Sequence, residues 1–308
     1  MSGRRRLSIV AGALTLALTG CGLGAGPKPE GAALQVTENF GALPLAALAA
    51  PRVAGQETAM SLLERNERVT THYGGGFVES INGRSGGIVH GHPVDWFYYV
   101  DGILASQGAA DTVVHNGERI WWDLHDWSVT DGVPAVVGSF PEPFLHGVAG
   151  QRPPVAVRCV GATGACGTVL ARLRAIGAQP TTLAREVPPP HDAVVVLVGT
   201  LAALRGQAAI DAVDQGPRTS GVYVTAPAAG TALELLDEDG APVRRVTGDV
   251  GLVAATSGPG ALPVWLVSGT DAAGVQAAAS MLDERDLTDR YALVVAAGAH
   301  IAVPTATR

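Results

Sequence analysis

The chain contains few lysine, cysteine and aromatic residues, and its composition disfavours some classes of binding partner. Lys28 stands alone among arginines, which we attribute to genome composition, and acidic residues outnumber basic ones by 28 to 21. Aromatic residues make up only 5% of the 308 residues. An acidic chain repels phosphate groups, so nucleic acid and anionic lipid surfaces are poor partners.

The chain also has too short an apolar run at its N-terminus to cross a bilayer. Residues 7–18 follow Arg4, Arg5 and Arg6, which is the pattern of a signal peptide, whereas a spanning helix needs about 20 apolar residues. The letters LTGC that end at Cys21 resemble the bacterial lipobox. We therefore predict that residues 1–20 are removed, which leaves 18 basic and 28 acidic residues, a net charge of −10.

The lipobox implies two acyl chains, such as palmitate, on Cys21, and two chains on one residue give stable anchoring. The predicted location is the extracytoplasmic face of the cell membrane, with residues 21–32 as a flexible tether rich in Gly and Pro. The general and twin-arginine export routes both remain open.

The chain has three cysteines. With Cys21 lipidated, Cys159 and Cys166 remain, and an exported chain favours a disulfide between them. A redox or metal-binding pair is disfavoured, because the spacing is not C-x-x-C and no His lies within the twenty residues that follow Cys166. Closing this short loop is expected to stabilise the fold by about 2.5 kcal/mol.

A shift in composition near Gly150 predicts two domains. Most rings and most histidines lie between residues 72 and 146, and the rest of the chain is rich in Ala, Val and Gly. We predict a β-rich α+β domain over residues 33–149, with a helix at 59–66 begun by Thr58. For residues 150–308, alternating strand and helix patterns predict an α/β domain with a mainly parallel sheet.

No motif supports catalysis. The letters GRSGG at 83–87 match G-x-S-x-G, but Ser85 is followed by two glycines and a poor helix start, so it lacks the strand-turn-helix context. No nucleophile and base pair has supporting context, and we predict that the chain is not an enzyme.

The glycine-rich letters VGATGACGTV at 160–169 do not match a dinucleotide fingerprint. Their spacing differs from G-x-G-x-x-G, and the acidic residue about twenty positions on, Glu186, lies in a proline-rich loop. A structural turn held by the disulfide is favoured over an anion site.

The histidines also make a weak case for a metal site. His90 and His92 form an H-x-H pair that could combine with His115, His125 and Asp126, but Gly91 and Pro93 indicate a loop instead of a strand. We therefore predict no metal site.

The letters DWFYYVDG at 95–102 place four aromatic residues side by side in a ring-poor chain. Alternation along a strand puts Trp96 and Tyr98 on one face and Phe97 and Tyr99 on the other. In the later strand, Trp121 points away from a core face that holds Ile120, Trp122 and Leu124. The outward rings are covered either by a second layer of protein or by a ligand or partner.

The order of these features resembles the C-terminal β-domain of the transcobalamin and intrinsic factor family and the related bacterial DUF4430 domain. The resemblance covers residues 33–127 and rests on a helix, a Gly-led strand that ends in the turn ING at Gly83, the DWFYYVDG strand and the strand that begins GERI at Gly117. It implies the fold of that β-domain.

The resemblance also implies a function. In transcobalamins this domain closes over a corrin ring held against an α/α barrel, so cobalamin or a related ligand is implied, with Trp96, Phe97, Tyr99 and Trp121 as contacts. No intrinsic cofactor is expected. Because the chain lacks a barrel, an α/α-barrel or transporter protein would have to complete the site. The alternative is a cell-envelope scaffold or adhesion lipoprotein without a small-molecule ligand.

The cobalamin hypothesis predicts that the isolated chain binds corrinoids weakly or not at all, and that Trp96→Ala weakens any binding. A half-site is not expected to supply the roughly −12 kcal/mol of a 1 nM complex. Titrating the delipidated protein with corrinoids while following tryptophan fluorescence measures this. Nanomolar affinity that survives Trp96→Ala would contradict the hypothesis.

Overall fold

A computed structural model describes residues 31–49, 51–72, 76–184, 186–258 and 260–306. The predicted signal peptide, the predicted lipidation site Cys21 and most of the predicted tether lie outside these residues. Within the described ranges, no helix has both the length and the apolar character needed to cross a membrane.

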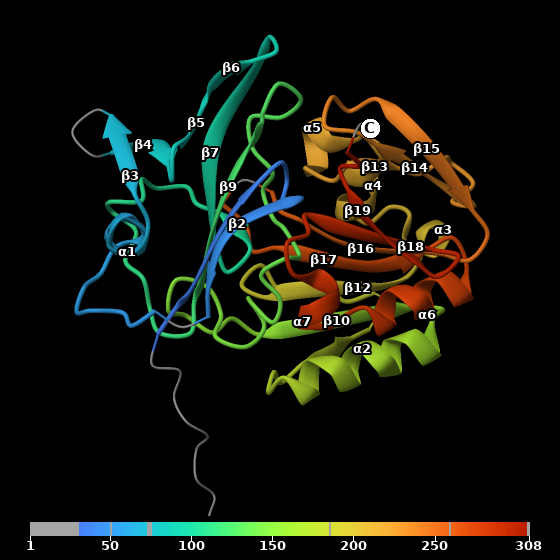
Figure 1. Cartoon of the computed structure of the whole chain (residues 1–308). Helices are drawn as coiled ribbons and strands as arrows, with labels where there is room; N and C mark the ends of the chain where they lie inside the picture. The colour runs from blue at the N-terminus through green and yellow to red at the C-terminus, as the bar shows by residue number, and fades with distance from the viewer. Residues whose placement is uncertain (1–30, 50, 73–75, 185, 259, 307–308) are drawn as a thin grey trace, which may run out of the picture.

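Two parts lie side by side, an N-terminal part coloured blue to green and a C-terminal part coloured from the green of β10 and α2 to red (Figure 1). The N-terminal part contains β1 (Ala33–Glu38), β2 (Leu43–Leu48), α1 (Ala59–Asn66), β3 (Val69–His72), β4 (Phe77–Ile81), β5 (Arg84–Ser85), β6 (Gly87–Val89), β7 (His92–Val100), β8 (Ile103–Leu104) and β9 (Arg119–Asp126).

The main sheet of the N-terminal part has the order β2-β1-β9-β7-β6, with β8 paired to β7. A small sheet, β3-β4-β5, and α1 lie on one side of it. The predicted helix and its cap are confirmed, because the Thr58 side chain accepts a hydrogen bond from the Ser61 N–H. The side of α1 that bears Leu62 and Leu63 is buried in the core of this part.

The C-terminal part contains the remaining elements. They are β10 (Val155–Val160), α2 (Thr163–Ala175), β11 (Thr181–Leu183), β12 (Val194–Thr200), α3 (Leu201–Leu204), α4 (Ala208–Asp214), α5 (Pro217–Ser220), β13 (Val224–Thr225), β14 (Ala232–Leu236), β15 (Pro242–Thr247), β16 (Val250–Thr256), β17 (Val264–Gly269), α6 (Ala272–Ser280), α7 (Glu284–Leu287), β18 (Ala292–Ala296) and β19 (Ala299–Val303).

The large sheet of this part is buried on both faces. Its order is β11-β10-β12-β17-β16-β18-β19, with α2 and α6 below it and the β13-β14-β15 sheet above it in Figure 1. Along β12, Val196 lies in the cluster on the α2 and α6 side, while Val195 and Leu197 lie in the opposite cluster. Burial on both faces explains the continuous apolar run of this strand.

The prediction of a mainly parallel sheet is only partly correct, because this sheet is mixed. Strands β11, β10, β12 and β17 run parallel, whereas β16, β18 and β19 pair antiparallel with their neighbours. Only residues 257–263 separate β16 from β17, which is too short for the crossover that parallel neighbours require. Likewise, a two-residue turn joins β18 to β19.

The predicted disulfide between Cys159 and Cys166 is confirmed. It joins the end of β10 to the first turns of α2, which begins at Thr163. The glycine-rich segment is therefore largely the beginning of a helix, where we expected a turn. Gly161, with a φ of +69°, is the residue that turns the chain between strand and helix.

The segment that connects the two parts, residues 127–154, packs into the interior. Glu142 of this segment is 1% exposed and lies near two other buried carboxyl groups, Asp101 and Glu118. One oxygen of Asp101 accepts a hydrogen bond from the Arg119 N–H at 2.9 Å. Burial, reinforced by the charges of Glu142 and Glu118, raises the pKa of Asp101 well above its usual value.

The burial of Asp101 predicts that Asp101→Asn stabilises the protein, and that the increase in the free energy of unfolding depends on pH. A raised folded-state pKa means that the wild type loses stability as pH rises from the ordinary carboxyl pKa, about 4, towards the folded-state value. The variant keeps an acceptor for Arg119 and carries no charge. Its free energy of unfolding should therefore increase relative to wild type between pH 4.5 and pH 8, as measured by urea denaturation.

Asp131→Asn, at an exposed position, is the matched control and should show no such trend. A constant difference between Asp101→Asn and wild type across this pH range would contradict the prediction.

Candidate functional site

The four predicted contact residues lie on β7 and β9, and the alternation of their faces is confirmed. Trp96 and Tyr98 pack in the core of the N-terminal part, while Tyr99 and Trp121 belong to the cluster that extends into the C-terminal part. Trp96 is 7% exposed, and its indole N–H donates to the Arg84 carbonyl at 3.2 Å. Phe97 is partly buried against the same cluster as Tyr99.

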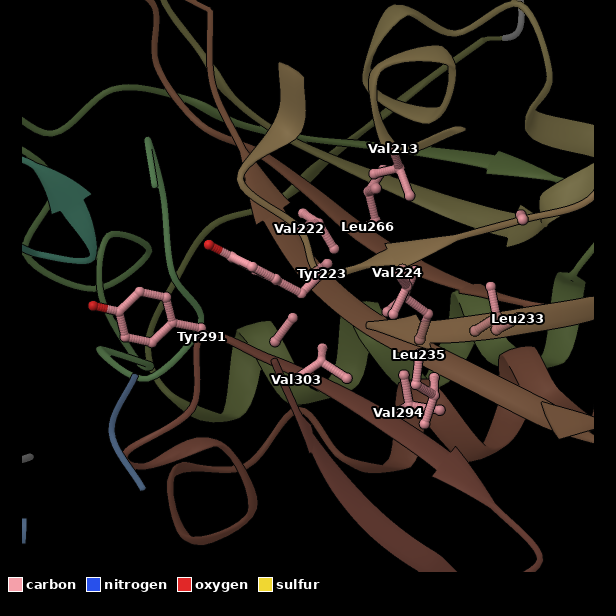
Figure 2. Packing of buried hydrophobic residues seen from close by; sticks show 14 of the residues in the cluster. Val213, Val222, Tyr223, Val224, Leu233, Leu235, Leu266, Tyr291, Val294 and Val303 are labelled. Carbon is pink, nitrogen blue, oxygen red and sulfur yellow. The ribbon is translucent and has the colours of Figure 1, made fainter. Parts of the chain in front are cut away.

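The C-terminal part covers the outward rings. Tyr99 and Trp121 are both 0% exposed, and the ring of Tyr291, beside β18, lies 5.7 Å from the first and 5.3 Å from the second. Figure 2 shows Tyr291 and Tyr223 beside aliphatic side chains of this part, such as Val303. The structure thus decides between the two alternatives: a second layer of protein covers these rings, and they form no open platform.

Phe40, Phe97 and His125 extend this ring packing. The imidazole of His125 lies between the two phenyl rings, with centroid distances of 4.5 Å to each. Phe40 also meets Tyr223 edge-on at 5.2 Å. We call Phe40, Phe97, Tyr99, Trp121, His125, Tyr223 and Tyr291 the interdomain cluster.

A buried hydrogen-bond network lies within this cluster and centres on Asp123, which is fully buried. One of its oxygens accepts from the Thr37 hydroxyl at 3.0 Å and the Gly41 N–H at 3.1 Å, and the other lies 3.4 Å from the Tyr291 hydroxyl. That hydroxyl is also 3.1 Å from Nδ1 of His125.

Asp123, His125 and Tyr291 carry groups that can act as acids and bases, but solvent does not reach them. Their exposed fractions are 0%, 2% and 3%, so a substrate does not reach them. Burial, with the negative charge of Asp123, raises the pKa of Tyr291 well above its usual value, which keeps the hydroxyl protonated. The network therefore joins the two parts. At its margin, Gln35 bonds to Asp289 and Arg119 pairs with Glu284.

An open hollow lies elsewhere between the two parts. It has a volume of about 510 Å³ and is bounded by the end of β8, the connecting segment, α5 and the loop between β16 and β17. Its lining residues are Ile103, Leu104, Ala105, Ser106, Thr130, Gly132, Pro134, Val148, Arg218, Thr219, Gly221, Ser257, Gly258, Gly260, Ala261 and Leu262.

Two smaller hollows adjoin this one and share lining residues with it. One of about 240 Å³ shares Leu104 and Val148 with it, and one of about 260 Å³ shares Ala261 and Leu262. The walls are mostly aliphatic or glycine, and we call the three hollows together the interdomain groove. A volume of this order is typical of small-molecule sites.

The charge and shape of the groove depend on the short helix α5. Arg218 is exposed on this helix, and no ion pair involving it is found within the described residues. Gly221, with a φ of +72°, ends the helix, and a Cβ there would lie 2.5 Å from the ring of Pro134. Glycine is therefore required where the connecting segment approaches α5 and closes one wall.

The serine and histidine residues of the other sequence motifs lie in several separate places, except for one pair. Ser85 lies on β5, exposed and paired with Ser80, so the strand-turn-helix arrangement of a nucleophile is absent there. His115 bonds to Glu118, and His125 lies in the interdomain cluster. His92 and Asp126 do come together, with Nδ1 and Oδ2 2.9 Å apart.

Comparison with known families supports the resemblance seen in the N-terminal part. The family described as a domain of unknown function (DUF4430) matches residues 56–126, which run from just before α1 to the end of β9. No curated protein matches the chain.

The sequence indicated the rings but not the groove. The groove is assembled from four separate segments of small and aliphatic residues, which carry no motif of their own. The one available signal was Arg218, an exposed cation that directly follows Gly216 and Pro217 in a ring-poor region.

The packing of Trp121 predicts a large loss of stability for Trp121→Ala. Removing a fully buried indole from the interdomain cluster should lower the free energy of unfolding by about 3–5 kcal/mol. Phe77→Ala, which removes a ring that is 45% exposed, is the control and should change it by roughly 0.5 kcal/mol or less. Urea denaturation of both variants measures the free energy of unfolding. A similarly small decrease in both would contradict the conclusion that Trp121 packs in the core between the two parts.

Proposed function

We propose that this protein is a lipid-anchored, extracytoplasmic binding protein that holds an elongated amphipathic molecule in the interdomain groove. The observation that carries the proposal is the groove itself, a hollow of about 510 Å³ that continues into a second and a third hollow. The predicted lipobox at Cys21 and the signal-peptide pattern support the location.

The walls indicate the chemical class of the ligand. Aliphatic contacts from Ile103, Leu104 and Leu262 favour an apolar body, because burying it removes hydrocarbon from water. Arg218 supplies a positive charge at the wall, and Ser257 and Thr219 supply hydroxyl groups. An anion with a long apolar portion, such as a fatty acid, fits this combination.

The corrin ligand implied by the family resemblance is less well supported by the geometry. Tyr99 and Trp121, two of its expected contacts, are covered by the C-terminal part, and Trp96 faces the core of the N-terminal part. A corrin held by this chain would have to use another surface, and the groove is the one that we propose to test.

The burial of these rings also favours a second candidate, a cell-envelope scaffold lipoprotein that takes no small ligand. In that case the rings serve only to join the two parts into one rigid unit, and exposed surfaces dock another protein. The two candidates differ in whether the groove binds small molecules.

The test uses 1-anilinonaphthalene-8-sulfonate, an amphipathic anion whose fluorescence rises in apolar surroundings. We expect saturable binding of one probe per chain and its displacement by a long-chain fatty acid. Ala261→Trp should weaken binding at least tenfold, because an indole there fills the junction of two hollows. Arg218→Gln should weaken it by about fivefold, the equivalent of a contact of about 1 kcal/mol.

Ala184→Trp, at an exposed position that lines none of these hollows, is the matched control and should bind as wild type does. Displacement of the probe by cobalamin would support the corrin ligand. The absence of saturable binding, or binding that is unchanged in Ala261→Trp, would contradict the groove and favour the scaffold.

A further inference from the structure

A separate hollow, of about 380 Å³, lies between the two parts and shares no lining residue with the three hollows of the interdomain groove. It differs in chemistry as well, because its walls include two histidines and several carboxylates. The lining residues are Glu38, Asn39, Phe40, Val89, His90, His92, Val94, Asp126, Glu238 and Asp239.

Three of these side chains converge on one point. His92 is the first residue of β7, Asp126 is the last residue of β9, and Asp239 lies in the turn between β14 and β15. The ligand atoms of all three lie within 4.8 Å of one another. Nδ1 of His92 is 2.9 Å from Oδ2 of Asp126 and 3.4 Å from Oδ1 of Asp239.

Separate contacts hold the two carboxylates in place. The other oxygen of Asp126, Oδ1, accepts from the Ser128 N–H at 2.7 Å, which leaves Oδ2 directed at His92. The turn that carries Asp239 is fixed by Asp237, whose buried carboxylate accepts from the N–H groups of Asp239 and Ala241 at 3.1 and 2.8 Å.

The charge around this hollow favours a cation. The carboxylates of Glu38, Asp126, Glu238 and Asp239 line it. Within the described residues, Asp126 and Asp239 pair with His92, and Glu38 lies 3.5 Å from Arg84. The Glu38 oxygen that faces Arg84, Oε2, is buried and accepts no hydrogen bond within the described structure.

We propose that His92, Asp126 and Asp239 bind a divalent transition-metal cation, such as Zn²⁺ or Mn²⁺, between the two parts. One imidazole nitrogen and two carboxylate oxygens are the ligand set that these cations accept, with water in the remaining positions. The side chain of Asp239 is about half exposed, so the cation reaches the site from solvent. Because Asp239 belongs to the C-terminal part and the other two to the N-terminal part, the cation links them.

The experiment uses the full mature chain, purified without a polyhistidine tag and stripped with a chelator. Isothermal titration at pH 7.5 with Zn²⁺ should give one site per chain, and thermal unfolding should shift to higher temperature with added Zn²⁺ because the cation binds only the folded arrangement. Co²⁺ should give visible absorption bands typical of nitrogen and oxygen coordination.

His92→Ala and Asp239→Asn should each weaken Zn²⁺ binding at least tenfold and remove the Co²⁺ bands. Asp239 lies in an exposed turn, so this variant is expected to fold, which circular dichroism checks. His300→Ala is the matched control, since His300 lies near a single carboxylate, Asp286, at 3.6 Å. The absence of a stoichiometric site, or equal binding by wild type, His92→Ala and Asp239→Asn, would overturn the proposal.

Discussion

The arrangement of the whole molecule depends on the contact between Trp121 and Tyr291. The two rings meet at 5.3 Å in the interior, and Tyr291 also reaches the buried Asp123 and His125. This contact brings a strand of the N-terminal sheet against the C-terminal part and excludes water from both. Since the polar groups are paired within the network, the burial of Asp123 is offset by hydrogen bonds.

Both proposed sites depend on this contact between the N-terminal and C-terminal parts. The interdomain groove lies where β8 and the connecting segment meet α5 and the loop between β16 and β17. The His92, Asp126 and Asp239 cluster lies where the ends of β7 and β9 meet the turn between β14 and β15. Each takes residues from both parts, so neither would exist if the parts were separate domains on a flexible linker. The buried residues of the connecting segment, such as Val136 and Phe140, hold the same arrangement.

The local elements were predictable because their signals are local. Thr58 begins α1, the alternation on β7 and β9 assigns each ring to a face, and the apolar run of β12 indicates a strand buried on both faces. The antiparallel half of the large sheet, formed by β16, β18 and β19, was not predicted. Whether neighbouring strands run parallel depends on which strands become neighbours, and the sequence pattern of a single strand does not contain that information.

The sequence by itself determined the two compositional regions, the disulfide between Cys159 and Cys166, and the opposite facing of Trp96 and Trp121. Only the tertiary structure decided what covers the outward rings. It also decided that Asp239 joins His92 and that Leu262 shares a wall with Leu104. The physical reason is that spacing along a strand sets the direction of a side chain, whereas its partner is set by packing between segments more than one hundred residues apart.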